Sequence, residues 1–196
     1  MNRARMEAFS DGVIAVIITI MVLELQVPES TEWQALYAML PKFMSYVLSF
    51  IYVGLYWNNH HHMLHYLNKV NGKILWSNLF FLFCLSLLPF GTAWMGEHHF
   101  EQNTTVFYGV LLVLVAVAYT ILAYRIKKQE GKDSAFVAAV GANVKEKISV
   151  ALYIAGIISS FFFPYYIALG FYYFVALMWI VPDRRLEKAL ADNSAS

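Results

Sequence analysis

Long apolar runs alternate with short polar segments along most of the chain. The first run extends from Phe9 to Val27, and between Gly12 and Leu23 it holds one side chain able to form a hydrogen bond, that of Thr19. Such a run is typical of a helix that crosses a bilayer. The pattern predicts six spans, approximately Phe9 to Val27, Leu36 to Asn58, Ile74 to Met95, Thr104 to Tyr124, Ile148 to Phe163 and Tyr165 to Val181. We therefore expect an all-α, polytopic membrane protein with six transmembrane helices, forming a single domain over residues 1–196.

Two of these boundaries have competing interpretations. The last two spans are separated only by Pro164 in the run FFFPYY, where a turn is favoured because proline ends a helix. A single long kinked helix is the alternative. At the other end of the chain, Arg3 and Arg5 before an apolar run resemble a signal peptide, but no small-x-small cleavage site follows. The run is therefore kept as the first span.

Basic residues are distributed asymmetrically between the predicted loops. If the N-terminus is cytoplasmic, every Lys and Arg except Lys42 falls on the inside, whereas the outside loops carry Glu29, Glu32, Glu97 and Glu101. Cytoplasmic loops are enriched in basic residues, so both termini are expected to be cytoplasmic. The longest inside loop, Arg125 to Lys147, contains AFVAAVGANV, a candidate short interfacial helix.

Composition narrows the possible functions. The chain is 60% hydrophobic and 14% charged with a net charge of +1, which argues against a nucleic-acid partner. The lone Cys84 excludes an intrachain disulfide or a cysteine zinc site. His61 and His65 have the i, i+4 spacing of a metal pair, but His98 and His99 fall on the opposite side of the membrane, so no metal is expected. No GxSxG elbow, P-loop or pair of carboxylates facing a pocket indicates an enzyme.

Topology brings the polar residues of the first three spans to one side of the membrane. The first span begins with Arg5, Ser10 and Asp11, the second ends with YWNNHHHMLH, and the third begins with residues that include Asn78. An unpaired Asp near a membrane end costs on the order of 1 to 3 kcal/mol. Asp11 is therefore expected to find partners among Trp57, His60, His61, Asn78 and an Arg5 of another helix or subunit. The cluster is either a structural clamp or a group whose rearrangement or protonation gates function.

The first span also carries an almost apolar stripe. At 100° per residue, five residues fall within a band about 100° wide, namely Gly12, Val16, Thr19, Ile20 and Leu23. The other spans offer too few polar side chains to line a wet passage within one subunit, so a pore would need several copies. Around a symmetry axis this stripe would form a hydrophobic constriction with a ring of hydroxyls. A seam for helix association is the alternative.

Three motifs resemble the lysosomal potassium channel family, transmembrane protein 175. The first is Arg-x-x-x-Phe-Ser-Asp from Arg5 to Asp11, followed eight residues later by Thr19. The second is YWNNHH from Tyr56 to His61, and the third is Asn78 with Leu88, Pro89 and Phe90. The resemblance implies a potassium channel of a prokaryotic cell membrane, in which six-span subunits form a homotetramer around the first helix. It implies no TVGYG filter and no cofactor beyond the permeant ion.

Site residues follow from the same resemblance. Val16, Ile20 and Leu23 would form the constriction and Thr19 the hydroxyl ring. Val16 stands where the family usually has Ile or Leu, which implies a wider ring. The residues implied to tie the first helix to its neighbours are Arg5, Phe9, Ser10, Asp11, Trp57, His60, His61 and Asn78. A proton-coupled secondary carrier that uses Asp11 and the cluster His60 to His62 is the alternative function, and a purely structural membrane protein is a third.

Overall fold

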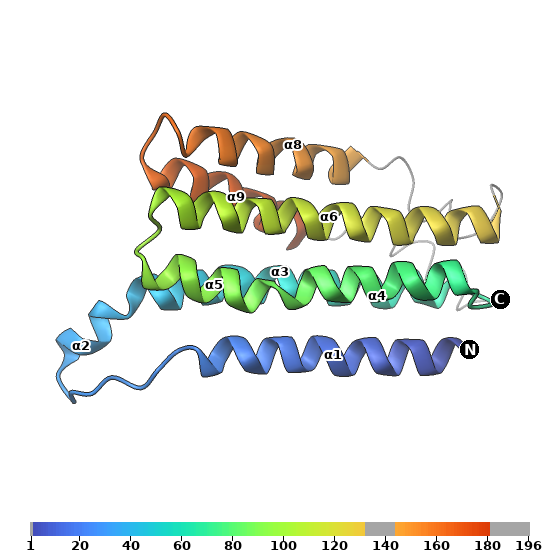
Figure 1. The fold of residues 1–196 in the computed structure, drawn as a ribbon, viewed down its shortest axis with the longest axis horizontal. Helices are drawn as coiled ribbons and strands as arrows, with labels where there is room; N and C mark the ends of the chain where they lie inside the picture. The colour runs from blue at the N-terminus through green and yellow to red at the C-terminus, as the bar shows by residue number, and fades with distance from the viewer. Residues whose placement is uncertain (1, 132–143, 181–196) are drawn as a thin grey trace.

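A bundle of long helices is seen in a computed structural model of the chain, which describes residues 2–131 and 144–180 (Figure 1). The helices in chain order are α1 (Arg3–Leu23), α2 (Trp33–Ala38), α3 (Leu40–His65), α4 (Gly72–Ser86), α5 (Leu88–Glu97), α6 (Gln102–Glu130), α8 (Val144–Ser159) and α9 (Tyr165–Ile180). The described residues form no strand, so the predicted all-α class is confirmed.

Several of these helices suit a bilayer. Three helical stretches among the described residues are long and apolar enough to cross one, Arg3–Leu23, Gly72–Glu97 and Gln102–Glu130. Helix α3 has 26 residues but is more polar, and α8 and α9 have 16 residues each. The chain is thus a multi-pass membrane protein.

Two predicted spans are interrupted near a proline. The second begins as the separate helix α2, breaks at Met39, and resumes as α3 with Pro41 in its first turn. The third breaks at Leu87, and Pro89 lies in the first turn of α5. Proline has no N–H to continue the ladder of helical hydrogen bonds, so each break lies just before it. The third predicted span nevertheless forms one apolar helical stretch, Gly72–Glu97, that is long enough to cross a bilayer.

Helix limits also differ from the prediction at the ends. Helix α1 begins at Arg3, because the side chain of Asn2 accepts a hydrogen bond from the backbone N–H of Ala4 at 3.2 Å. Helix α3 continues beyond Asn58 to His65, so the histidine run is helical. The turn at Pro164 is confirmed, since α8 and α9 are separate helices, and the single kinked helix is wrong. The predicted interfacial helix, apart from Val144, and the predicted end at Val181 lie outside the described residues.

Buried hydroxyl groups link the helices in the middle of the bundle. Ser49 of α3 contacts the Thr92 hydroxyl of α5 at 2.6 Å and the Tyr108 hydroxyl of α6 at 2.8 Å. Tyr52 of α3 donates to the backbone carbonyl of Tyr172 in α9 at 2.6 Å. Buried polar groups are destabilising unless they are paired, so these bonds fix how the helices face one another.

The alternating helix directions collect the predicted inside residues at one end. Here Arg3 donates to the His65 carbonyl at 2.8 Å, and Asn68 donates to Glu130 at 2.6 Å. We name this the basic end. At the opposite, acidic end, Lys42 forms an ion pair with Glu97 at 3.1 Å. The arrangement is the one that the charge distribution requires, while the side of the membrane that each end faces stays a prediction.

Candidate functional site

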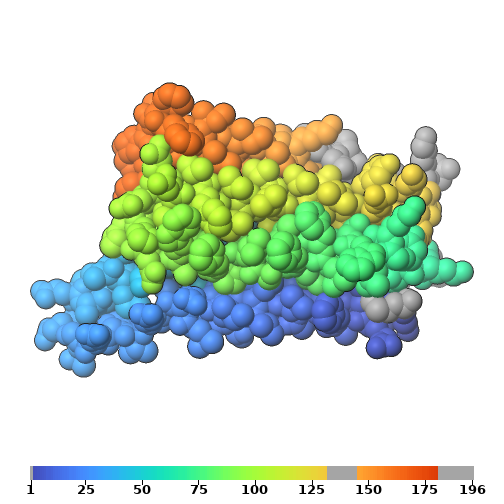
Figure 2. Space-filling model, in the orientation of Figure 1, coloured from blue at the N-terminus to red at the C-terminus, as the bar shows by residue number. Residues whose placement is uncertain are grey.

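Helix α1 is covered on one side only. Its buried residues recur at intervals of three or four along the helix, and they are Met6, Ser10, Ile14, Ile17 and Met21. These side chains face α3, α4 and α5, the helices that α1 contacts. In the space-filling view α1 forms one edge of the molecule (Figure 2). The helix is therefore anchored along one face, and no described residue outside α1 covers the opposite face.

The predicted stripe lies on this uncovered face. The side chains of Val16, Ile20 and Leu23 are 55%, 41% and 77% exposed, and Gly12 and Thr19 are exposed as well. A Cβ atom added at Gly12 would meet nothing within 4 Å, so this glycine is not required for packing inside the subunit. The Thr19 hydroxyl donates to the Val16 carbonyl at 2.8 Å, so its oxygen remains able to accept a hydrogen bond.

A groove runs beside the stripe, between α1 and the junction of α4 with α5. Its volume is about 790 Å³. Phe9, Val16 and Ile20 contribute from α1, whereas Pro89 and Phe90 contribute from α5. The lining is mostly apolar, so its exposure to water would be unfavourable. It is suited to contact with lipid or with another helix.

Asp11 is held by the second span. The indole Nε1 of Trp57 donates to Asp11 Oδ1 at 3.0 Å. Trp57 also stacks on His61, with ring centroids 6.3 Å apart and planes 29° apart. A charge-assisted bond of this kind stabilises a carboxylate that would otherwise be poorly solvated at the helix surface. The prediction that Trp57 is a partner of Asp11 is confirmed.

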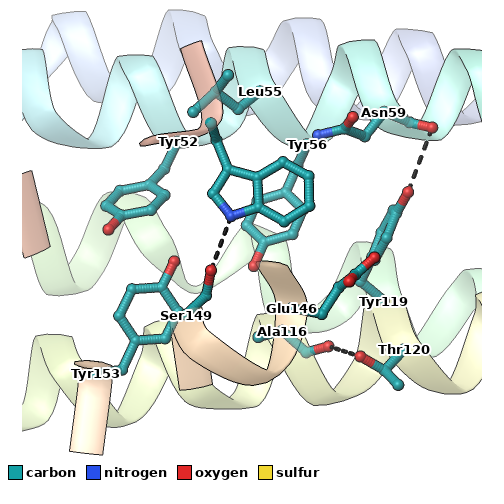
Figure 3. A pocket seen from close by; sticks show the side chains of 11 residues that line it. Tyr52, Leu55, Tyr56, Asn59, Ala116, Tyr119, Thr120, Glu146, Ser149 and Tyr153 are labelled. Carbon is teal, nitrogen blue, oxygen red and sulfur yellow. Dashed lines mark hydrogen bonds between the residues drawn. The ribbon is translucent and has the colours of Figure 1, made fainter. Parts of the chain in front are cut away.

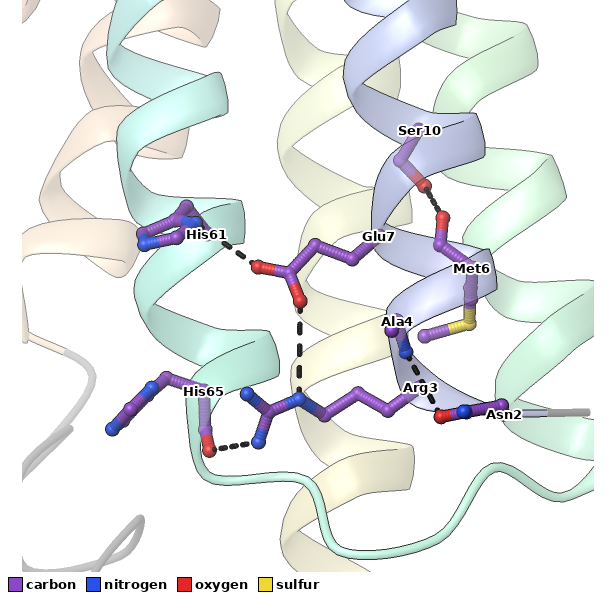
Figure 4. A network of polar contacts seen from close by, with 8 residues as sticks. All are labelled: Asn2, Arg3, Ala4, Met6, Glu7, Ser10, His61 and His65. Atoms are coloured by element: carbon purple, nitrogen blue, oxygen red, sulfur yellow. Dashed lines mark hydrogen bonds and ion pairs between the residues drawn. The ribbon is translucent and has the colours of Figure 1, made fainter.

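One turn below Asp11, Glu7 joins α1 to the histidine run of α3 (Figure 4). Glu7 contacts His61 Nδ1 at 3.1 Å through one carboxylate oxygen and Arg3 Nε at 3.8 Å through the other. Arg3 in turn reaches the last turn of α3 through the carbonyl of His65. These contacts and the bond from Trp57 to Asp11 join the two helices over about two turns.

A second, fully buried chain of hydrogen bonds joins α1, α4 and α3. Asn78 Nδ2 donates to Ser10 Oγ at 2.9 Å, and Ser10 donates to the Met6 carbonyl at 2.8 Å. Asn78 Oδ1 lies 2.7 Å from His60 Nε2. Because the amide nitrogen of Asn78 is used toward Ser10, its oxygen must accept, and His60 Nε2 carries the proton.

The other ring nitrogen of His60 has no partner. Nδ1 is buried without a hydrogen bond among the described residues, and the ring stacks on Phe81 with centroids 5.5 Å apart. A proton on Nδ1 would be a buried donor without an acceptor, which is costly. The geometry therefore holds His60 as a neutral imidazole in one tautomer, with Asn78 fixing its orientation.

A small cavity lies on the far side of α3, between α3, α6, α8 and α9 (Figure 3). Its volume is about 40 Å³, enough for a few water molecules. Tyrosine side chains line much of it, with Glu146 and Ser149 from α8. The Ser149 hydroxyl accepts from Trp179 Nε1 at 2.8 Å. A space of this size does not offer a hydrated ion a route through the subunit.

Comparison with known proteins decides the family. The sequence model of the family described as endosomal/lysosomal potassium channel TMEM175 matches residues 5–89. A potassium channel of Chryseobacterium sp. (strain P1-3) is 55% identical over 193 residues, which cover 98% of this chain and 100% of that protein. The chain belongs to the TMEM175 family. A potassium channel of Streptomyces collinus is 33% identical over 132 residues, 63% of this chain and 64% of that protein.

A solved structure of the TMEM175 family shows the same fold. The crystal structure of a lysosomal potassium-selective channel TMEM175 homolog from Chamaesiphon minutus superposes with a TM-score of 0.78 at 23% identity. The match covers 91% of this chain and 96% of that chain. Membership of the TMEM175 family makes the chain a channel protein and does not favour the alternative of a proton-coupled carrier.

The predicted partners of Asp11 divide into separate groups in this TMEM175 member. His60 bonds to Asn78, Asn78 also bonds to Ser10, and His61 bonds to Glu7, so none of the three forms a hydrogen bond with Asp11 among the described residues. Arg5 and Phe9 are exposed, and Phe9 lines the groove. An Arg5 contact across a subunit boundary stays a prediction, as does any gating role of these residues.

Sequence reasoning missed two members of the network, Arg3 and Glu7. A signal was present, since Arg3, Glu7 and Asp11 succeed one another at intervals of four and so share one face of α1. The expectations of no enzyme activity and no cofactor stay predictions. Within the described residues, no group of three or more His, Cys, Asp or Glu side chains is arranged to hold a metal ion.

Proposed function

We propose that four copies of this chain assemble around their α1 helices into a potassium-selective channel of the cell membrane. The observation that carries the proposal is the uncovered apolar face of α1, where all five residues of the stripe are exposed. The names of the Chryseobacterium and Streptomyces relatives, both potassium channels, support the choice of ion. The distribution of charge supports a cytoplasmic location for the basic end.

The proposed constriction consists of three apolar rings. With a rise of 1.5 Å per residue, Val16, Ile20 and Leu23 occupy levels separated by about 6 and 4.5 Å, so the rings span roughly 10 Å of the axis. Thr19 adds a ring of hydroxyl oxygens between the first and last of them. Apolar rings of this kind control conduction by wetting and by width.

Bi-ionic reversal potentials in planar bilayers or liposome patches test the constriction. Val16→Ala removes two methyl groups from each copy and is expected to raise the permeability to sodium relative to potassium. Val22→Ala is a matched control, because Val22 is also exposed on α1 but lies about 120° around the helix from Val16. Unchanged reversal potentials in Val16→Ala, or an equal shift in Val22→Ala, would exclude Val16 from the constriction.

Assembly and mode of transport have their own measurements. The purified protein is expected to have a mass near four times 22.5 kDa after correction for bound detergent. Potassium flux into liposomes is expected to be fast and not to saturate with concentration. The mass of a monomer would contradict the proposed assembly of four copies around a shared axis. Saturating flux coupled to proton movement would instead indicate the carrier, and an absence of flux a structural protein.

A further inference from the structure

A second groove lies at the basic end, between α4 and α6, on the side of α4 that does not face α1. Its volume is about 700 Å³. Lys73, Trp76 and Phe80 line it from α4, and Ile121 and Arg125 line it from α6. None of these residues belongs to the stripe or to the polar network of α1. The groove therefore needs an explanation separate from the proposed pore.

The groove is polar at one end and apolar at the other. Lys73 lies in the first turn of α4, and Arg125 lies near the basic end of α6. Farther from the basic end, Trp76 is 73% exposed, Phe80 is 42% exposed and Ile121 is 37% exposed. The exposed apolar side chains continue along α6 through Val117 and Leu114. Cations at the end and hydrocarbon surface beyond it match the two parts of a phospholipid.

The two cations have no carboxylate partner among the described residues. The ion pairs found there are those of Arg3 with Glu7, Lys42 with Glu97 and His61 with Glu7. Glu130, close in sequence to Arg125, instead accepts hydrogen bonds from the backbone and side-chain nitrogens of Asn68 at 3.2 and 2.6 Å. Positive charge in the groove is thus available to an external anion. The positive end of the α4 dipole adds to it.

A second copy of the chain is a poorer occupant than a lipid. The exposed glutamates Glu29, Glu32, Glu97 and Glu101 are at the acidic end, so a copy in the same orientation cannot bring them to this groove. Among the described residues at the basic end, Glu7, Asp11 and Glu130 already bond to other residues of the chain, and Glu146 lines the small cavity between α3, α6, α8 and α9. If the basic end faces the cytoplasm, as the charge distribution predicts, the groove opens toward lipid headgroups, whose anionic members attract clustered Lys and Arg.

We propose that this groove binds an anionic phospholipid, with the phosphate between Lys73 and Arg125 and an acyl chain over Trp76, Phe80 and Ile121. The occupant is a lipid of the leaflet at the basic end. Basic pockets between membrane helices on the cytoplasmic side are suited to such headgroups. Each basic residue contributes roughly fivefold to the preference for an anionic surface, so the pair contributes roughly 25-fold.

Quenching of Trp76 fluorescence by brominated lipids tests the proposal. The protein is titrated with brominated phosphatidylglycerol or brominated phosphatidylcholine, and the signal of Trp76 is isolated as the difference from Trp76→Phe. Brominated phosphatidylglycerol is expected to quench the Trp76 fluorescence at a lower mole fraction than brominated phosphatidylcholine does. The double variant Lys73→Gln with Arg125→Gln is expected to lose this preference. The matched control, Lys127→Gln with Lys128→Gln, changes two exposed cations at the same end but outside the groove and is expected to retain it.

Several results would overturn the proposal. Equal quenching of the unmodified protein by the two lipids excludes a preference for anionic lipid, whether or not the double variant folds. If the double variant retains the preference for phosphatidylglycerol, Lys73 and Arg125 do not bind the phosphate. Loss of the preference when inorganic phosphate is added would assign the groove to a free anion. A fall in oligomer mass in the double variant, without any dependence on lipid, would assign it to a contact between copies.

Discussion

Asn78 is the residue on which the attachment of α1 to the bundle can be tested most directly. It is fully buried and bonds to Ser10 of α1 on one side and to His60 of α3 on the other. Asn78→Ala removes both bonds and leaves the His60 Nε2 donor without an acceptor. Hydrogen bonds between membrane helices contribute about 0.6 to 2 kcal/mol each. The loss of two predicts a destabilisation of roughly 1 to 4 kcal/mol.

Ser77→Ala is the matched control for this experiment. Ser77 is the neighbouring residue and is also buried, but its hydroxyl donates to the Lys73 carbonyl of its own helix at 2.8 Å. That carbonyl already accepts the helical hydrogen bond, so the variant is expected to cost less than about 1 kcal/mol. Reversible unfolding in mixed micelles, titrated with sodium dodecyl sulfate, gives the free energy of each variant.

A double-mutant cycle then separates the hydrogen bond from general loss of packing. Ser10→Ala and Asn78→Ala each remove the same contact between α1 and α4, so the double variant is expected to cost about 0.5 kcal/mol or more below the sum of the single variants. Ser10→Ala combined with Ser77→Ala is expected to be additive. Additivity of Ser10→Ala with Asn78→Ala, within about 0.3 kcal/mol, would refute the reasoning.

Two further predictions concern other contacts of the bundle. Trp57→Phe keeps an aromatic ring but removes the N–H that donates to Asp11. The variant is expected to weaken assembly or alter currents in the same direction as Asp11→Ala, but less strongly. Unchanged oligomer mass and currents in both variants would show that this contact has no part in assembly or conduction. Gly109→Ala is expected to destabilise by about 1 to 3 kcal/mol, because the added Cβ would lie 2.7 Å or less from atoms of Tyr172 and Ile157. Gly54→Ala, which meets nothing within 4 Å, is its control and should be neutral or stabilising when unfolding is measured.

The class of fold and the stripe could be predicted because each depends on a local period. Apolar runs of spanning length indicate membrane helices, and a turn of 100° per residue places Gly12, Val16 and Leu23 on one side of α1. The same period describes a pore lining and a seam between helices equally well. The packing of α1 against α3, α4 and α5 shows which face the described residues leave uncovered.

The pairing of residues within the polar network could not be predicted from their spacing in the sequence. Asp11, Glu7 and Ser10 all lie in the first half of α1, and which of them meets Trp57, His61 or Asn78 depends on the rotation of three helices about their axes. Helix ends were missed for a related reason. The helix that carries YWNNHHHMLH continues past the predicted limit at Asn58 to His65, where His60 and His61 contact Asn78 and Glu7.

The two faces of helix α1 differ in how they are packed. Its covered face is held by an apolar ridge that includes Met6 and Ile14 and by the buried bond from Asn78 to Ser10. Val16 and Leu23 on the open face make no comparable contact with the part of the chain that the structure describes. Substitutions on the covered face should therefore change the free energy of unfolding before they change the choice of ion. Substitutions on the open face should do the reverse, because removing an exposed methyl group costs the single subunit little. A variant of Val16 that lowered the stability of the isolated subunit would show that this face is covered within the chain after all.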